Sequence, residues 1–416
     1  MTPTRKVLYT NNSAMLLYGL SGVLIGPTLP GMISTFNLTM GQAGLIGAIQ
    51  NAGGLAGALI TLFIADRVSH NRTAVVSFVL IGLALFAVGV SPTYTTVLVT
   101  IALTGIFIRI MDVMLNASTG DFSRPQPGQN PNSGKAMSTL HLFYSIGAFV
   151  GPIAARAIMG AGLSWSQVFQ YIGLTYIVVV VARFRWLRTY SRIHPDPPAP
   201  ATTPTPESTP QPTPPNDAPT SPTAPHARTA IVLMGGVLFF YAIHQVGINS
   251  WVPYFLETAR GANPNIAGIG LSAYWIGIIL GRYLTSRLVH RLGANPLLVV
   301  GCTISAAATL AAVLIPHPLA AQVFFALAGV TSGATIPLGY SVAYEFNPTR
   351  TGFITAFVSL LMLGGRFLGP WTIGITADTI GLIAAMTIPG WALLFAAVLG
   401  GHVWFYHHRF RPCNHA

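Results

Sequence analysis

Long apolar segments alternate with short polar ones along the whole chain. A helix that crosses a bilayer needs about 20 mostly apolar residues, and twelve segments of the sequence meet this requirement. They lie near residues 9–33, 41–65, 72–90, 95–119, 135–160, 165–188, 229–257, 265–290, 296–315, 318–345, 351–377 and 380–406. The pattern predicts an all-α, polytopic membrane protein whose twelve transmembrane helices form two six-helix bundles.

A polar stretch near residues 189–228 separates the two groups of six segments. It is dense in Pro, Thr and Ala, a composition that forms an extended tether and cannot pack a core. We therefore expect an N-terminal six-helix bundle over residues 1–188 and a Pro-rich cytoplasmic linker over 189–228. Residues 229–416 are expected to form the C-terminal six-helix bundle and a cytoplasmic tail.

The two halves carry related motifs at similar positions. The segment G-A-F-V-G-P begins at Gly147, and G-R-F-L-G-P begins 218 residues later at Gly365. Parallel repeats of this kind are typical of transporters in which one half rocks on the other around a midplane site. The sequence thus favours alternating access.

Composition excludes several classes of protein. The chain is 52% hydrophobic and only 7% charged, whereas soluble domains have about 25% charged residues. Two cysteines offer no disulfide framework, and the sequence has no phosphate-binding glycine loop or nucleophile elbow. We expect neither an enzyme nor ATP-driven transport, and no cofactor. The spacing of His and Cys in the tail fits no zinc pattern, so we expect no metal.

The net charge of +12 has a membrane explanation rather than a nucleic-acid one. Basic residues gather in alternate loops, as the positive-inside bias requires, and the opposite loops carry only Arg260. The basic loops include Arg67, Arg72, Arg124, Lys135, Arg188, Arg192, Arg287, Arg291 and Arg350. This distribution predicts a multi-pass protein of the cell inner membrane with both termini cytoplasmic. We expect a monomer in the lipid bilayer that binds protons and a small molecule but no nucleic acid.

Four polar residues lie inside the fourth and fifth segments: Arg109, Asp112, Asn116 and His141. A charge at membrane depth costs roughly 2.5 to 3.5 kcal/mol even on insertion scales, so such groups are commonly functional. Arg109 and Asp112 are three residues apart and share a helix face. They form either a fixed salt bridge or a titratable switch that uses the protonation of Asp112. His141 lies at a similar depth, where it can meet Asp112, although a lone helical His is more often structural.

A second set of polar candidates lies in the C-terminal half. Amides with aromatic rings suit a neutral polyhydroxy ligand, although aromatic residues near helix ends also serve as interface anchors. Arg366 is placed to bind an anionic group or to pair with a carboxylate. The candidate substrate-binding residues are Asn116, His244, Gln245, Asn249, Tyr274, Tyr340 and Arg366.

Several motifs resemble the major facilitator superfamily over the whole chain. A-D-R-V-S-H-N-R from Ala65 is similar to its gating motif, with Asp66 and Arg67 in the acidic and basic places but without the expected glycine. F-N-L-T-M-G-Q-A-G-L-I from Phe36 resembles the bacterial fucose:proton symporter family. So do M-D-V-M-L-N-A from Met111 and Y-A-I-H-Q-V-G-I-N-S-W from Tyr241.

This resemblance implies a role in proton coupling for Asp112 and a place in the sugar cavity for Asn116 and Gln245. Two positions depart from the family pattern. Gly26 stands where fucose transporters carry a second acidic residue, and Arg109 stands where members usually have glycine.

The sequence favours a proton-coupled symporter of a sugar-like small solute. A proton-driven exporter of drugs or amphipathic compounds is the alternative, but the exporter pattern after Gly151 and Pro152 is incomplete. A membrane receptor or scaffold that transports nothing would leave the intramembrane charges without a use.

Overall fold

A computed structural model describes residues 3–122, 133–182, 188, 192, 225–347 and 350–409. Within these ranges, twelve helical segments are long and apolar enough to cross a membrane. Their bounds follow the sequence closely: the span predicted at 41–65, for example, is Met40–Ile64. The prediction of an all-α, polytopic membrane protein is confirmed. Most of the expected linker over 189–228 lies outside the described residues.

The N-terminal half consists of seven α-helices and one short 3-10 helix in its described part. They are α1 (Pro3–Gly22), α2 (Ile25–Phe36), α3 (Met40–Ile64), η1 (Ala65–Arg67), α4 (His70–Gly89), α5 (Tyr94–Phe122), α6 (Ser133–Gly160) and α7 (Trp165–Ala182).

The C-terminal half begins with a helix that starts at Pro225, earlier than the expected start of this span at 229. Its described helices are α9 (Pro225–Thr258), α10 (Pro264–Leu292), α11 (Ala294–Leu314), α12 (Pro318–Ser332), α13 (Thr335–Glu345), α14 (Thr351–Ile380), α15 (Leu382–Ala385) and α16 (Ile388–Arg409).

Three of the predicted spans are each divided into two helices, and a proline explains every division. Proline has no N–H to donate to the carbonyl four residues earlier, and its ring clashes with that carbonyl. Pro27 stands four residues after Val23, where α1 gives way to α2, and Pro337 stands four residues after Gly333, between α12 and α13. Pro389 follows the end of α15 in the same way.

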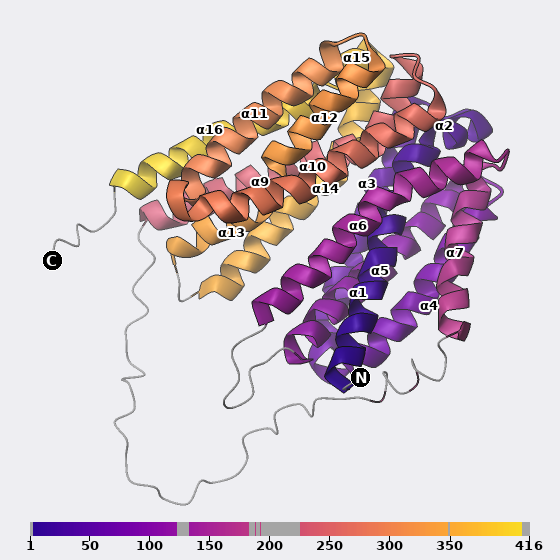
Figure 1. Ribbon diagram of the computed structural model, residues 1–416, viewed down its shortest axis with the longest axis horizontal. Helices are drawn as coiled ribbons and strands as arrows, with labels where there is room; N and C mark the ends of the chain where they lie inside the picture. The colour runs from indigo at the N-terminus through magenta and orange to yellow at the C-terminus, as the bar shows by residue number, and fades with distance from the viewer. Residues whose placement is uncertain are drawn as a thin grey trace, which may run out of the picture.

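The two halves form a V (Figure 1). The bundles lie close together near α2 and α15, and they lie apart at the opposite end, where α1 begins and where α13 lies. Three helix pairs join the halves: α3 with α14, α6 with α10, and α2 with α9. A solute site between the halves would therefore be bordered by these helices.

Small residues bring α3 and α14 into backbone contact. A Cβ atom built on Gly44 would lie 2.4 Å from the carbonyl oxygen of Pro370, and one on Gly374 would lie 2.2 Å from that of Met40. No side chain larger than hydrogen fits at either position without moving a helix. This is the close packing that small residues permit in membranes.

Candidate functional site

A cavity lies between the two halves, walled by residues of α1, α2, α3, α5, α6, α9 and α14. Its volume of about 70 Å³ gives room for several water molecules in this conformation. The polar side chains of its wall are Tyr18, Gln50, Asn51, Arg109, Tyr144, Asn249, Ser250 and Arg366. Both halves thus contribute polar groups to one shared cavity.

Backbone carbonyls add acceptors to this wall. Gly26, Asn249 and Arg366 line the cavity, and each stands four residues before a proline inside its own helix. Because proline cannot donate a hydrogen bond, these three carbonyl groups lack their usual helical donor. The prolines concerned are Pro30, Pro253 and Pro370. The carbonyl oxygen of Asn249 faces the backbone of Gly26, so the carbonyl groups of Gly26 and Arg366 are the ones left to accept hydrogen bonds from water or from hydroxyl groups of a ligand.

Asp112 is held by two side chains of its own helix. Nη1 of Arg109 donates to Oδ2 of Asp112 at 2.9 Å, and Nδ2 of Asn116 donates to Oδ1 at 3.0 Å. The Asp112 side chain is 14% exposed and that of Arg109 is 21% exposed. Arg109 is on the cavity wall, so the carboxylate communicates with the cavity through this guanidinium group. The three predicted residues of α5 form one cluster.

His141 lies at the exposed surface of α6. Within the described part of the chain, no hydrogen bond or ion pair joins its ring to Asp112. Its carbonyl oxygen accepts a hydrogen bond from Ser145, and Ser145 in turn accepts one from Nη1 of Arg282 on α10 at 3.0 Å. This chain of contacts ties α6 to α10, and the imidazole interacts with Asp112 through the electrostatic field without a hydrogen bond.

Two of the candidates in the C-terminal half, Asn249 and Arg366, are on the cavity wall. Oδ1 of Asn249 accepts a hydrogen bond from Nε1 of Trp275 at 3.0 Å, which fixes the orientation of the amide. Arg366 lies near the middle of α14. Its Nε atom is buried and has no hydrogen-bond partner among the described residues.

The remaining candidates of this half are not among the residues that line the cavity. His244 is fully buried, with Nδ1 at 3.2 Å from the carbonyl oxygen of Pro389. Gln245 and Tyr274 are also buried, and the hydroxyl of Tyr340 hydrogen-bonds Ser359 at 2.7 Å. These residues pack the bundle around the cavity in this conformation.

Five residues of the wall were not predicted from the sequence: Tyr18, Gln50, Asn51, Tyr144 and Ser250. Gln50 and Asn51 are adjacent amides that interrupt an apolar segment, and this interruption is the sequence pattern from which a place on the wall could have been predicted. The two tyrosines meet edge to face across α1 and α6, with ring centroids 4.8 Å apart. Their pairing depends on how these helices cross, which no local pattern specifies.

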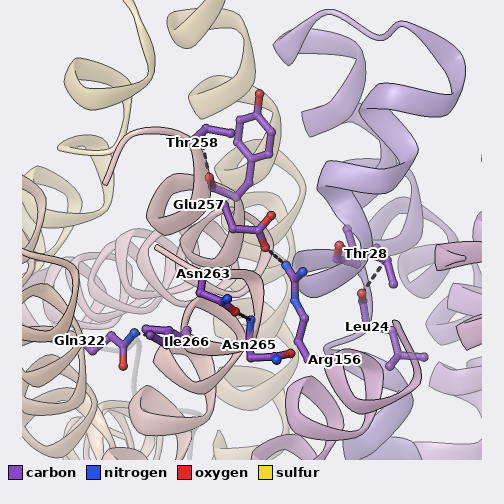
Figure 2. Close-up of polar contacts among 11 residues, drawn as sticks. Leu24, Thr28, Arg156, Glu257, Thr258, Asn263, Asn265, Ile266 and Gln322 are labelled. Carbon is purple, nitrogen blue, oxygen red and sulfur yellow. Dashed lines mark hydrogen bonds and ion pairs between the residues drawn. The ribbon is translucent and has the colours of Figure 1, made fainter. Parts of the chain in front are cut away.

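Polar contacts between the halves close the narrow end of the V. The carboxylate of Asp378 on α14 accepts hydrogen bonds from the backbone N–H groups of Met40 and Gly41, at 2.8 and 2.7 Å. It therefore caps the N-terminus of α3, where a negative charge is stabilised by the helix dipole. Figure 2 shows the second contact, an ion pair between Arg156 of α6 and Glu257 of α9.

The gating motif lies at the other end of α3. Asp66 and Arg67 belong to η1, and Arg67 is exposed. The side chain of Asp66 lies outside the described part of the structure.

Comparisons with known proteins agree with this architecture. The family model described as the Major Facilitator Superfamily matches residues 13–370 and 233–412. The 3-(3-hydroxy-phenyl)propionate transporter of Escherichia coli K12 is 25% identical over 415 residues, which cover 96% of this chain and 94% of that protein. An uncharacterized MFS-type transporter of Yersinia pestis is 25% identical over 64% of this chain, and this alignment spans 63% of that protein.

The fold is shared with a solved transporter. A bacterial homolog of the human lysosomal transporter Spinster, in an inward-facing and occupied conformation, superposes with a TM-score of 0.78. The two chains are 17% identical, and the alignment covers 100% of each.

Proposed function

This chain belongs to the Major Facilitator Superfamily and is a transporter rather than an enzyme, and we propose that it is a proton-coupled symporter of a small sugar-like solute. The proposal includes alternating access of the two halves to the cavity. It makes Asp112 the proton-binding group, as the resemblance to fucose:proton symporters implies.

The position of Asp112 is the observation that carries this proposal. Its carboxylate is one ion pair away from the cavity, because it binds Arg109 on the wall. Protonation of Asp112 removes the charge that holds the guanidinium group and frees Arg109 to interact with cavity contents. Solute binding and proton binding then strengthen each other by the same factor, as linkage requires.

The wall supports a hydroxyl-bearing solute. Amides of Gln50, Asn51 and Asn249 offer both donors and acceptors. The freed carbonyl groups of Gly26 and Arg366 accept further hydrogen bonds, and the rings of Tyr18 and Tyr144 offer apolar faces. This combination suits a sugar-like molecule, which has hydroxyl groups around a C–H face.

The V gives the proposed direction of opening. Its wide end is the end where α1 begins (Figure 1) and where the basic residues Arg67 and Arg72 occur between α3 and α4. The positive-inside bias favours a cytoplasmic position for this end, and it supports the proposal of an inward-facing state of a multi-pass inner-membrane protein with both termini inside. The working unit is one chain, because the cavity is complete within it.

The experiment is solute uptake by full-length protein in liposomes under an imposed pH gradient. The panel contains hexoses, deoxyhexoses and 3-(3-hydroxyphenyl)propionate, since one relative is named for that compound. Uptake by the wild type is expected to rise when the outer compartment is acidified, because the proton and the solute enter together. Asp112→Asn is expected to retain solute exchange at equal concentrations and to lose the response to pH.

Asp121→Asn is the matched control on the same helix. Asp121 pairs with His70 within the N-terminal half at 2.9 Å and is not on the cavity wall. This variant should respond to pH as the wild type does. An Asp112→Asn variant with the full pH response would overturn the coupling role. Acid-driven efflux of amphipathic compounds, with no sugar uptake, would instead support the exporter alternative.

A further inference from the structure

The cavity contains more positive charge than the described side chains neutralise. Arg109 and Arg366 are both on its wall, and the Arg109 charge is matched by Asp112 at 2.9 Å. In the described part of the chain, no carboxylate lies within ion-pair distance of Arg366. The described wall therefore carries one uncompensated guanidinium group near the middle of the membrane.

The acidic residues of the described helices are engaged elsewhere. Both oxygens of Asp112 are already bound, one by Arg109 and the other by Asn116. The other acids of these helices are not on the wall: Asp121 pairs with His70, Glu257 pairs with Arg156, Asp378 caps α3, and Glu345 lies at the end of α13. None of these carboxylates is free to neutralise Arg366 in this conformation.

An unpaired cation at this depth is costly, since burial of a charge is tolerated only when it is paired or hydrogen-bonded. Arg366 is a half-buried side chain of the wall, and its buried Nε atom has no partner among the described residues. A guanidinium group presents parallel N–H donors whose geometry matches a carboxylate. An anionic ligand would supply the negative charge that the described residues do not place beside Arg366.

We infer that the transported solute is a hydroxylated monocarboxylate, such as a sugar acid, whose carboxylate binds Arg366. This inference rests on the proposed function and narrows its substrate class from neutral sugars to their acids. The amides, tyrosines and freed carbonyls of the wall bind the hydroxyl-bearing part, while Arg366 binds the acidic group. While Asp112 is ionised, one solute carboxylate leaves the described wall of the occupied cavity without excess charge.

The test compares matched pairs of neutral and acidic sugars. Full-length protein in nanodiscs is titrated with glucose and glucuronate, galactose and galacturonate, and mannose and mannuronate, and affinity is measured by calorimetry. At least one acid is expected to bind tenfold or more tightly than its neutral partner. Arg366→Gln should abolish that preference. Arg366→Lys keeps the positive charge but loses the two parallel N–H donors, so it should retain part of the preference.

Arg287→Gln provides the matched control, because Arg287 is exposed and contacts Tyr283 on its own helix. It should preserve the preference for the acid. If no acid binds more tightly than its neutral partner, or if Arg366→Gln keeps the preference, the inference is wrong.

A second measurement on the wild type does not depend on the folding of a variant. Phenylglyoxal modifies accessible arginines, and peptide mass spectrometry reports its extent at Arg366. The hexuronate is expected to slow modification of Arg366 at least threefold, while the neutral hexose has no effect; equal protection by both would contradict the inference.

Failure of the inference and failure of the proposed function are separable. Asp112→Asn should keep the preference for the acid while it loses the response to pH. A pH response with neutral sugars alone would support proton coupling and overturn the assignment of Arg366. A preference for acids without any pH response would support the assignment of Arg366 and overturn proton coupling.

Discussion

Gly26 shows how one residue constrains the chemistry of the cavity. Fucose transporters resembling this chain carry an acidic side chain at the aligned position, whereas a Cβ atom on Gly26 would lie 2.1 Å from the carbonyl oxygen of Asn249. The backbones of α2 and α9 are in contact here, so an acidic side chain has no space. Asp112 is left as the carboxylate next to the described cavity wall, which concentrates the proposed coupling in a single group.

Gly26→Ala is therefore expected to force α2 and α9 apart. Overpacking of this kind costs about 1 to 3 kcal/mol, and the thermal unfolding temperature of the purified protein should fall accordingly. Gly22→Ala is the control, because a Cβ atom there would meet its nearest neighbour, a side-chain atom of Tyr18, at an ordinary 3.7 Å. Equal unfolding temperatures for the two variants would show that the contact at Gly26 is readily relieved.

Prolines decide where the helices break and where their carbonyls are exposed. Breaks follow from Pro27, Pro337 and Pro389, while Pro253 and Pro370 stay inside intact helices. Discontinuous helices at membrane depth are typical of transporter binding sites, where freed backbone groups bind the cargo. In this chain the freed carbonyls of the cavity belong to helices of both halves.

Pro30→Ala is expected to weaken solute binding without destabilising the protein. Alanine restores the N–H group that bonds the carbonyl of Gly26 on the cavity wall, and so removes one acceptor from the cavity. A hydrogen bond contributes about 0.5 to 1.5 kcal/mol, which corresponds to a roughly 2- to 10-fold loss of affinity by calorimetry. Pro152→Ala is the control and should leave affinity unchanged, because the carbonyl freed by Pro152 belongs to Ala148, which is not on the wall. A loss of affinity in that variant as well would point to a general effect on helix shape.

Sequence patterns predicted the spans well and the cavity wall only in part. Apolar segments of about 20 residues must become membrane helices, so the bounds of Met40–Ile64 or Pro318–Glu345 follow from composition. The wall depends on which face of each helix turns inward, and that is set by packing between distant segments. Arg366 and Asn249 were selected because they are polar in an apolar context, whereas Tyr18 and Tyr144 resemble ordinary core aromatics until α1 and α6 are seen to cross.

The whole molecule is held closed at one end by contacts between its halves. Asp378 caps α3 across the interface, and Arg156 pairs with Glu257 near the same end (Figure 2). These contacts exist only while that end is closed, so they stabilise the present state relative to one open on the other side. The wide end of the described structure has no equivalent contact between α1 and α13 (Figure 1).

Asp378→Asn should shift the population toward the outward-open state. The carboxylate accepts two backbone hydrogen bonds at the positive end of a helix dipole, and charge-assisted bonds contribute about 1.5 to 3 kcal/mol each. A cysteine at position 250, on the cavity wall, should react at least fivefold faster with an impermeant maleimide added outside. Asp121→Asn is the control, because it disturbs an ion pair within one half. Unchanged labelling in Asp378→Asn would mean that the contact of Asp378 with the N-terminus of α3 does not hold this end closed.

One carboxylate beside the cavity has an energetic consequence for the cell. If Asp112 carries one proton and Arg366 accompanies one anionic solute, each turnover moves one positive and one negative charge in the same direction. The membrane potential is worth about 2.3 kcal/mol per elementary charge at 100 mV, but an electroneutral cycle can draw nothing from it. Accumulation by this protein would then be set by the difference in acidity between the two compartments, and a cell that is polarised but not acidified outside would gain no concentrating power.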